Sequence, residues 1–252
     1  MRPQVIQKAV FSGLMVAIGI ILTYFLSVTI PPTGAAIIRF GIGYLPLILI
    51  SILYGPIYGL MAGISQDLLG IFLIGAPVYG YAFSPVYTFN AALYGVLPGL
   101  LFQLRFRRDK LLFFWLNYAL LTLFVGVAGY YFFNIENVYS QTLGAAEKYV
   151  LLAIGVAAAG VLAVLNLIVY RKARYGEFGP KLLFVVLILY MIVSLGTTPL
   201  QIALYQAIPY WSLLPLRIIK MPIEVMIYVV LLVTLLKLLV QLANHKHLNQ
   251  EE

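Results

Sequence analysis

Apolar residues occur in long runs along this sequence, and short clusters of proline, glycine and charged residues separate the runs. A helix needs about 20 apolar residues to cross a hydrocarbon core of roughly 30 Å, and eight runs predict membrane-spanning helices on this basis. The predicted spans are 9–30, 42–54, 57–74, 84–104, 111–133, 149–170, 181–208 and 214–239. The pattern therefore predicts an all-α fold, a polytopic transmembrane bundle that forms a single integral membrane domain over 1–252.

The second predicted span is irregular. It has about 13 apolar residues, which would extend roughly 20 Å as a helix. Pro46 lies within it, so we expect either a kinked helix or an extended segment that begins near Ile37. The segments 31–43 and 75–85 are rich in proline, glycine and aromatic residues. Irregular backbone near membrane depth is tolerated where it packs on protein or lines a wet cavity, so we expect a cavity beside these two segments.

Composition and charge support a membrane protein. Hydrophobic residues make up 63% of the chain and charged residues 10%, which leaves too little polar surface for a soluble domain. The net charge of +8 does not indicate nucleic-acid binding, because the basic residues lie at the ends of apolar segments. With both termini in the cytoplasm, that side receives most of the 16 basic residues. They are Arg2, Lys8, Arg105, Arg107, Arg108, Lys110, Arg171, Lys172, Arg174, Lys181, Lys237 and Lys246.

Residues that would support catalysis or metal binding are scarce. The chain has no cysteine, and His245 and His247 both lie in the polar C-terminal tail. No phosphate-binding loop motif occurs, so ATP hydrolysis by this chain is not expected. Asp67 and Glu224 are the acidic residues that lie clearly within predicted spans. We therefore expect no enzyme activity, metal site or cofactor, and a membrane-embedded enzyme acting on lipid is disfavoured.

Ionisable residues within predicted spans are expensive in a bilayer and therefore indicate function. Arg217, Lys220 and Glu224 are separated by three and four residues, which places them on one helical face. Lys220 and Glu224 would form an internal ion pair, leaving positive charge at Arg217 and, near the second span, at Arg39. That charge favours an anionic ligand. The alternatives are a structural Asp67 and an Arg39 that extends to lipid headgroups.

Aromatic and small residues give two further indications. Most aromatic residues near the expected cavity would form an interfacial belt, and a minority would stack on a flat ligand. They are Tyr44, Tyr79, Tyr81, Phe83, Tyr87, Tyr205, Tyr210 and Trp211. In the first span, Ala9, Gly13 and Ala17 recur every four residues, which allows another helix to approach closely. This repeat is also common by chance, so it identifies a candidate docking surface.

Several of these segments together resemble a known family. The first is Arg39-Phe40-Gly41-Ile42-Gly43-Tyr44-Leu45-Pro46-Leu47, followed by Tyr54-Gly55-Pro56 and the run GISQDLLG from Gly63 to Gly70. The next are Phe83-Ser84-Pro85-Val86-Tyr87-Thr88 and Leu213-Leu214-Pro215-Leu216-Arg217 with Lys220-Met221-Pro222-Ile223. In this order they resemble the substrate-binding S component of energy-coupling factor (ECF) transporters, in the folate-type branch, over roughly 1–105 and 181–240.

The resemblance implies a vitamin-uptake subunit in the plasma membrane of a prokaryote. Such a subunit captures its vitamin outside the cell and reorients in the membrane, with a transmembrane coupling protein and two ATPase subunits as partners. It implies substrate-binding roles for Arg39, Asp67, Tyr87, Arg217 and Lys220, with folate or a related pterin as ligand. It also implies that the repeat of Ala9, Gly13 and Ala17 docks on the coupling protein.

This sequence departs from the family pattern in one respect. Family members usually have six helices, so 111–170 is interpreted as an inserted helical hairpin between core segments 1–105 and 181–240. Two alternatives remain open on the sequence alone. One is a stand-alone secondary transporter, although no internal repeat is evident. The other is an S component for another vitamin or a modified base.

Overall fold

The computed structural model describes residues 3–30, 38–74, 85–106, 108–134, 137–138, 141–142, 144–172, 178–206 and 209–248. Within these ranges the chain is almost entirely helical, and seven stretches are long and apolar enough to cross a membrane. A shorter apolar helix, Leu45–Tyr54, is the eighth. The structure thus confirms the predicted all-α polytopic bundle of about eight spans.

The elements follow one another in this order: α1 (Pro3–Tyr24), β1 (Val28–Ile30), β2 (Ile38–Phe40), α2 (Leu45–Tyr54), α3 (Pro56–Ile74), α4 (Pro85–Gln103), α5 (Asp109–Asn134), β3 (Asn137–Val138), β4 (Gln141–Thr142), α6 (Ala145–Arg171), α7 (Gly179–Leu189), the π-helix η3 (Tyr190–Thr197), α8 (Thr198–Gln206) and α9 (Tyr210–Leu248). Both strand pairs are antiparallel.

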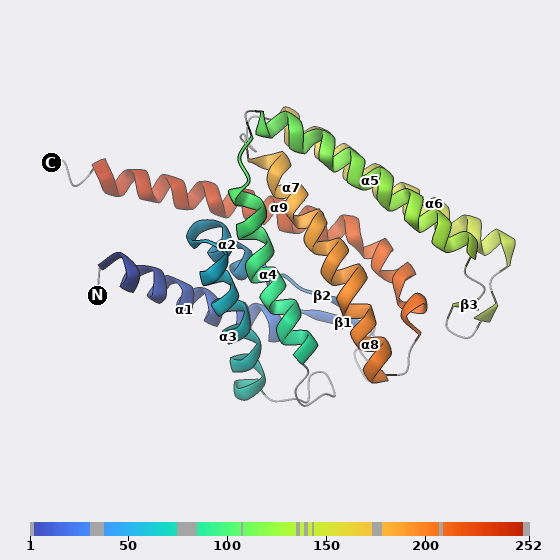
Figure 1. The fold of residues 1–252 in the computed structure, drawn as a ribbon, viewed down its shortest axis with the longest axis horizontal. Helices are drawn as coiled ribbons and strands as arrows, with labels where there is room; N and C mark the ends of the chain where they lie inside the picture. Colours follow the sequence, from blue (N-terminus) through green and yellow to red (C-terminus); the bar gives the residue numbers. More distant parts are fainter. Residues whose placement is uncertain are drawn as a thin grey trace.

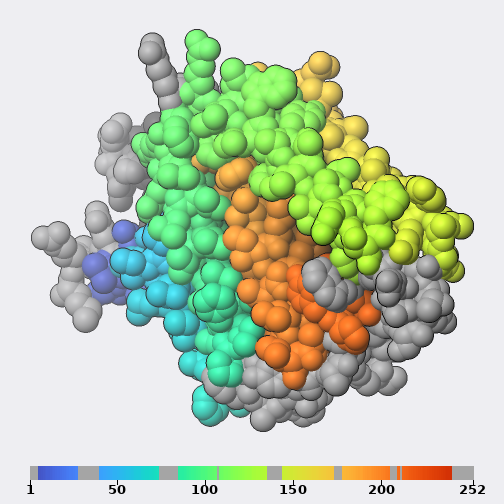
Figure 2. Space-filling model, turned by 45° about the vertical axis from the view of Figure 1, so that its right-hand side comes forward, coloured from blue at the N-terminus to red at the C-terminus, as the bar shows by residue number. Residues whose placement is uncertain are grey.

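Helices α1 to α4 pack against one another, and α7 and α9 join them through contacts of α4 with α7 and of α2 with α9. The α5–α6 hairpin packs mainly on α7 and α9 and lies along one side of the bundle (Figure 1). Figure 2 shows α7 in orange between α4 and α5. The interpretation of this hairpin as an insertion into a six-helix core stays a prediction. Helix α1 begins and α9 ends on the same side of the molecule (Figure 1).

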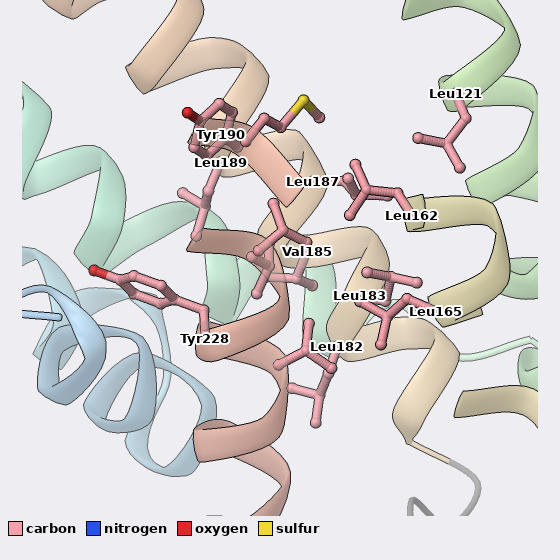
Figure 3. Packing of buried hydrophobic residues seen from close by; sticks show 14 of the residues in the cluster. Leu121, Leu162, Leu165, Leu182, Leu183, Val185, Leu187, Leu189, Tyr190 and Tyr228 are labelled. Carbon is pink, nitrogen blue, oxygen red and sulfur yellow. The ribbon is translucent and has the colours of Figure 1, made fainter. Parts of the chain in front are cut away.

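The larger hydrophobic core forms where α7 meets the hairpin and α9. Leucines of α5, α6 and α7, among them Leu121, Leu162 and Leu183, face one another there (Figure 3). The hydroxyl groups of Tyr190 and Tyr228 point away from these leucines (Figure 3). Tyr228 donates a hydrogen bond to the carbonyl oxygen of Gly41 at 3.1 Å. Helices α7 and α9 therefore bury apolar surface against the hairpin, and η3 and α9 direct these two hydroxyl groups away from it.

Two polar contacts join the hairpin to α7. Asn117 and Asn166 are fully buried, and the amide of Asn117 donates to Asn166 at 3.0 Å and to the carbonyl oxygen of Pro180 at 2.9 Å. Near the same end, the ammonium group of Lys181 lies 3.3 Å from the carboxylate of Asp109. A buried amide without partners would cost about 1–3 kcal/mol, so these bonds favour one alignment of the hairpin on α7.

The structure corrects three details of the predicted spans. The first helix ends at Tyr24 rather than at 30, and Val28–Ile30 pairs with Ile38–Phe40. Val28, Thr29 and Ile30 are β-branched, which favours a strand over a helix. Pro46 does not kink the second span, because α2 begins at Leu45 and proline is well tolerated in the first helical turn. An extended segment precedes this helix, as one of the two predicted alternatives had it. The last helix continues to Leu248, beyond 239.

Candidate functional site

The polar face of α9 forms the centre of the candidate site. Arg217 and Lys220 are each 5% exposed, and Lys220 lies 3.0 Å from the carboxylate of Glu224. The ammonium group of Lys220 also lies 5.5 Å from the ring centre of Phe40 in β2 and 6.0 Å from that of Tyr190. The predicted ion pair of Lys220 with Glu224 is confirmed. Among the described residues, this face of α9 thus carries two cations and one carboxylate.

Arg217 reaches a carbonyl that the neighbouring helix leaves free. Its Nη1 donates a hydrogen bond to the carbonyl oxygen of Ser194 at 3.1 Å. In η3 the N–H of Thr198 bonds to Val193, five residues back, and the next donor in line would be residue 199. That residue is Pro199, which has no N–H. The carbonyl of Ser194 therefore has no donor within its helix and accepts from Arg217 instead.

A second backbone carbonyl of η3 also accepts a hydrogen bond from α9. The carbonyl oxygen of Leu195 accepts from the hydroxyl of Tyr210 at 2.8 Å. In the other direction, Tyr190 donates to the carbonyl oxygen of Arg217 at 2.8 Å. Helices η3 and α9 are thus joined by three polar contacts around Arg217, and π-helical turns of this kind are frequent at functional sites.

Helix α4 supplies aromatic and amide groups to the same region. The ring of Tyr94 stacks on that of Tyr44, with ring centres 4.3 Å apart and planes 6° from parallel. Tyr87 lies on the same helix, about two turns before Tyr94. Asn90 is buried and exchanges hydrogen bonds with the hydroxyls of Thr197 and Thr198. These groups connect α4 to the segment that contains the π-helix.

The close contact between α3 and α4 determines the position of Asp67. Gly59 lies against Gly95 and Gly63 against Ala91, with backbones so close that a Cβ on any of the three glycines would overlap a carbonyl oxygen. One turn further along, the hydroxyl of Thr88 donates to the carboxylate of Asp67 at 2.6 Å. Gly63 therefore serves the packing of α3 on α4. Small residues place Asp67 beside Thr88, the residue after Tyr87.

Of the predicted site residues, Arg217 and Lys220 lie together on the buried face of α9, and Asp67 accepts a hydrogen bond from Thr88, the residue after Tyr87. The structure describes the backbone of Arg39, which pairs with Thr29 in the β1–β2 ladder, and not its side chain. Within the described part of the chain, no three His, Cys, Asp or Glu residues lie together as metal ligands would. Sequence reasoning missed Tyr190, Asn90 and the carbonyl of Ser194. The dipeptide Thr198-Pro199 was the available signal, since a proline inside an apolar span removes helical donors.

The predicted docking surface lies on an exposed part of α1 beside its packed face, because Gly13 is three residues before the buried Val16. Ala9, Gly13 and Ala17 are exposed, and nothing lies within 4 Å of the position that a Cβ on Gly13 would take. The packed face is formed by Val16 and Ile20, which are buried, together with Gly19 against Gln66 of α3. The three small residues thus leave a shallow surface on α1 within a membrane-spanning stretch.

Comparison with known proteins identifies the family. Residues 4–172 match the model of a family described as the ECF-type riboflavin transporter, S component. This chain belongs to that family. As an S component it is a multi-pass membrane protein of a transport system and not an enzyme. The match begins in α1 and ends after α6, so it includes the α5–α6 hairpin.

One curated relative of this S component is a folate transporter from Clostridium novyi, strain NT. The two are 29% identical over 87 residues, which is 34% of this chain and 48% of the relative. The chain therefore matches about half the length of that relative. No solved structure matches.

Proposed function

We propose that this S component binds an anionic vitamin, folate or a related pterin, outside the cell and delivers it by reorienting within the membrane. The observation that carries the proposal is the buried face of α9, where Arg217 and Lys220 outnumber Glu224. Opposite charges attract one another more strongly in a buried site than in water, so a ligand carboxylate would bind favourably beside these two cations. The name of the folate-transporting relative supports the same ligand class.

Each predicted residue has a specific role in this proposal. Arg217 and Arg39 bind the glutamate carboxylates, because the planar guanidinium matches a carboxylate in two parallel hydrogen bonds. Asp67 accepts the paired N–H donors of the pterin ring. Tyr87, on the same helix as Thr88, stacks on that ring. Lys220 remains paired with Glu224 and sets the local potential beside Arg217.

Riboflavin is the second candidate ligand, because the family description names it. Riboflavin carries no carboxylate, so its binding would depend on the rings of Tyr44, Tyr87 and Tyr94 more than on Arg217. The two ligands therefore predict different sensitivity to substitution of Arg217.

The partners follow from the family. We propose that a transmembrane coupling protein docks on the surface formed by Ala9, Gly13 and Ala17, and that two ATPase subunits supply the energy. Both termini are placed in the cytoplasm in this proposal, which agrees with α1 beginning and α9 ending on one side of the bundle. The ligand side then includes the β1–β2 ladder and the loop 134–148. The membrane is the plasma membrane of a prokaryote.

Calorimetry on the purified subunit tests the ligand, with folate and riboflavin titrated separately. Arg217→Lys keeps the charge but removes the planar guanidinium that can donate two parallel hydrogen bonds. It should therefore weaken folate binding about tenfold or more, which corresponds to roughly 1.4 kcal/mol. Arg217→Met should cost more. Lys148→Met, which changes a half-buried cation on α6 that donates to the carbonyl oxygen of Phe133, is the matched control and should leave the affinity unchanged.

Thermal unfolding of each variant separates a lost ligand contact from the lost hydrogen bond to Ser194. Unchanged folate affinity in both Arg39→Met and Arg217→Met would refute the anionic site. Tight riboflavin binding that tolerates both substitutions, with no folate binding, would assign the site to the second candidate.

A further inference from the structure

Basic side chains converge at the end of the hairpin where α5 begins and α6 ends. Arg108 and Lys110 come from the start of α5, and Arg171 and Lys172 from the end of α6. The ammonium group of Lys110 lies 5.0 Å from the ring centre of Tyr170, which places the two helix ends side by side. Arg108, Arg171 and Lys172 are exposed, and Lys110 is half-buried. We refer to these four residues as the basic rim.

The carboxylate nearest in sequence to the basic rim is already engaged elsewhere. Asp109 lies 3.3 Å from the buried ammonium group of Lys181 and also accepts the backbone N–H of Phe106. Among the residues that the structure describes, none of the four basic side chains forms a salt bridge. The basic rim thus carries four positive charges that the described part of the protein does not neutralise.

Aromatic residues lie immediately below the basic rim. Trp115 is 62% exposed and packs edge-on against Phe114, whose ring also lies 4.3 Å from that of Tyr170. Trp115 is five positions after Lys110, so it lies about 7–8 Å further along the helix axis. This is the depth at which tryptophan occurs in membranes, between headgroups and acyl chains. The cations of the basic rim therefore lie at the level of the lipid headgroups, and the aromatic rings lie in the layer beneath.

We propose that the basic rim and Trp115 form a binding surface for anionic phospholipid, with the lipid phosphate between Lys110 and Arg171 and its acyl chain along Trp115. A lipid is the occupant because the basic rim lies at the ends of two membrane-spanning helices. Juxtamembrane cations attract anionic headgroups, and each contributes about fivefold to the affinity near the surface. The surface lies at one end of the hairpin, and none of its residues belongs to the site on α9.

Fluorescence quenching by brominated lipids tests this surface on the full chain. The chain has two tryptophans, so a Trp211→Phe background leaves Trp115 as the reporter. The protein is reconstituted in nanodiscs of phosphatidylcholine with 20 mol% of brominated phosphatidylglycerol (about one lipid in five, enough to compete at a surface of this kind). A parallel sample carries the same fraction of brominated phosphatidylcholine. Stronger quenching by the anionic lipid is expected, and it should weaken as salt is raised.

Variants assign the effect to the basic rim. Lys110→Gln and Arg171→Gln should each reduce the preference for phosphatidylglycerol by about fivefold. Arg171→Lys keeps the charge and should retain most of the preference. Lys148→Gln, at the opposite end of the same hairpin, is the matched control and should change nothing. Equal quenching by the two brominated lipids in the parent protein would overturn the proposal. The double variant Lys110→Gln, Arg171→Gln gives a second test, with its folding checked by circular dichroism. If the folded double variant still prefers phosphatidylglycerol, the proposal is also overturned.

Discussion

The contact between α3 and α4 permits a sharp test of how the site is held. Gly95 is buried in α4, and a Cβ there would overlap the carbonyl oxygen of Gly59. The obstacle is backbone, which cannot rotate away as a side chain would. To reach an ordinary carbon contact distance of about 3.5 Å, the two helices would have to separate by more than about 1 Å.

Two opposing effects set the expected magnitude for Gly95→Ala. Alanine is favoured over glycine inside a helix by about 1 kcal/mol. Overpacking a tight contact typically costs 1–3 kcal/mol, and here the contact is between rigid backbones, which places the cost at or above the upper end. We therefore expect Gly95→Ala to lower the free energy of unfolding by about 2 kcal/mol or more. Separation of the helices should also break the hydrogen bond between Thr88 and Asp67, so ligand affinity should fall as well.

Two glycines in the hairpin are matched controls for this substitution. At Gly126 in α5 and Gly160 in α6, an added Cβ would meet nothing within 4 Å. Gly126→Ala and Gly160→Ala should therefore keep the helix-propensity gain and raise the free energy of unfolding by about 0.5–1 kcal/mol. The double substitution Gly59→Ala, Gly95→Ala should cost less than the sum of the single ones, because helices already separated accommodate the second Cβ.

The measurement is the free energy of unfolding in mixed micelles titrated with SDS, followed by tryptophan fluorescence. A Gly95→Ala protein as stable as Gly126→Ala would refute the backbone contact between α3 and α4. Additive costs in the double variant would show that Gly59 and Gly95 do not share one contact.

Three further predictions concern docking, topology and the π-helix. Gly13→Leu or Ala17→Leu should abolish transport in the assembled transporter, because a bulky side chain holds the partner helix away. Ligand binding to the isolated subunit should stay nearly intact, and a parallel loss of binding would place α1 in the ligand site. A cysteine introduced at Asn137 should react with a membrane-impermeant reagent added from outside and one at Asn249 should not, and the reverse pattern would exclude cytoplasmic termini. Pro199→Ala supplies an N–H that competes with Arg217 for the carbonyl of Ser194, so helix stability should rise by up to about 1 kcal/mol while folate affinity falls. Calorimetry showing unchanged affinity would contradict the role assigned to the π-helix.

The sequence by itself determined those features that depend on spacing along one helix. Long apolar runs predicted the spans, since crossing a bilayer requires length and low polarity. The separations among Arg217, Lys220 and Glu224 placed them on one face and predicted the ion pair, because residues four apart on a helix are neighbours. The order of the motifs identified the S-component family without any knowledge of contacts.

Tertiary structure decided which groups from different elements meet. The pairing of Val28–Ile30 with Ile38–Phe40 depends on two segments that lie apart in the sequence. Likewise, Arg217 can donate to the carbonyl oxygen of Ser194 only because η3 lies against α9. Neither follows from local periodicity, because the partner in each case comes from elsewhere in the chain.

The small-residue repeats show the same division most clearly. Gly59 and Gly63 in α3 have the same four-residue spacing as Ala9, Gly13 and Ala17 in α1. In the structure, the first pair is packed against the backbone of α4, whereas the second set is exposed. A repeat of small residues determines that a helix can be approached closely, because it removes the side chains that would keep a neighbour away. Which helix approaches, and whether it belongs to this chain or to a partner, is decided by the packing of the whole bundle.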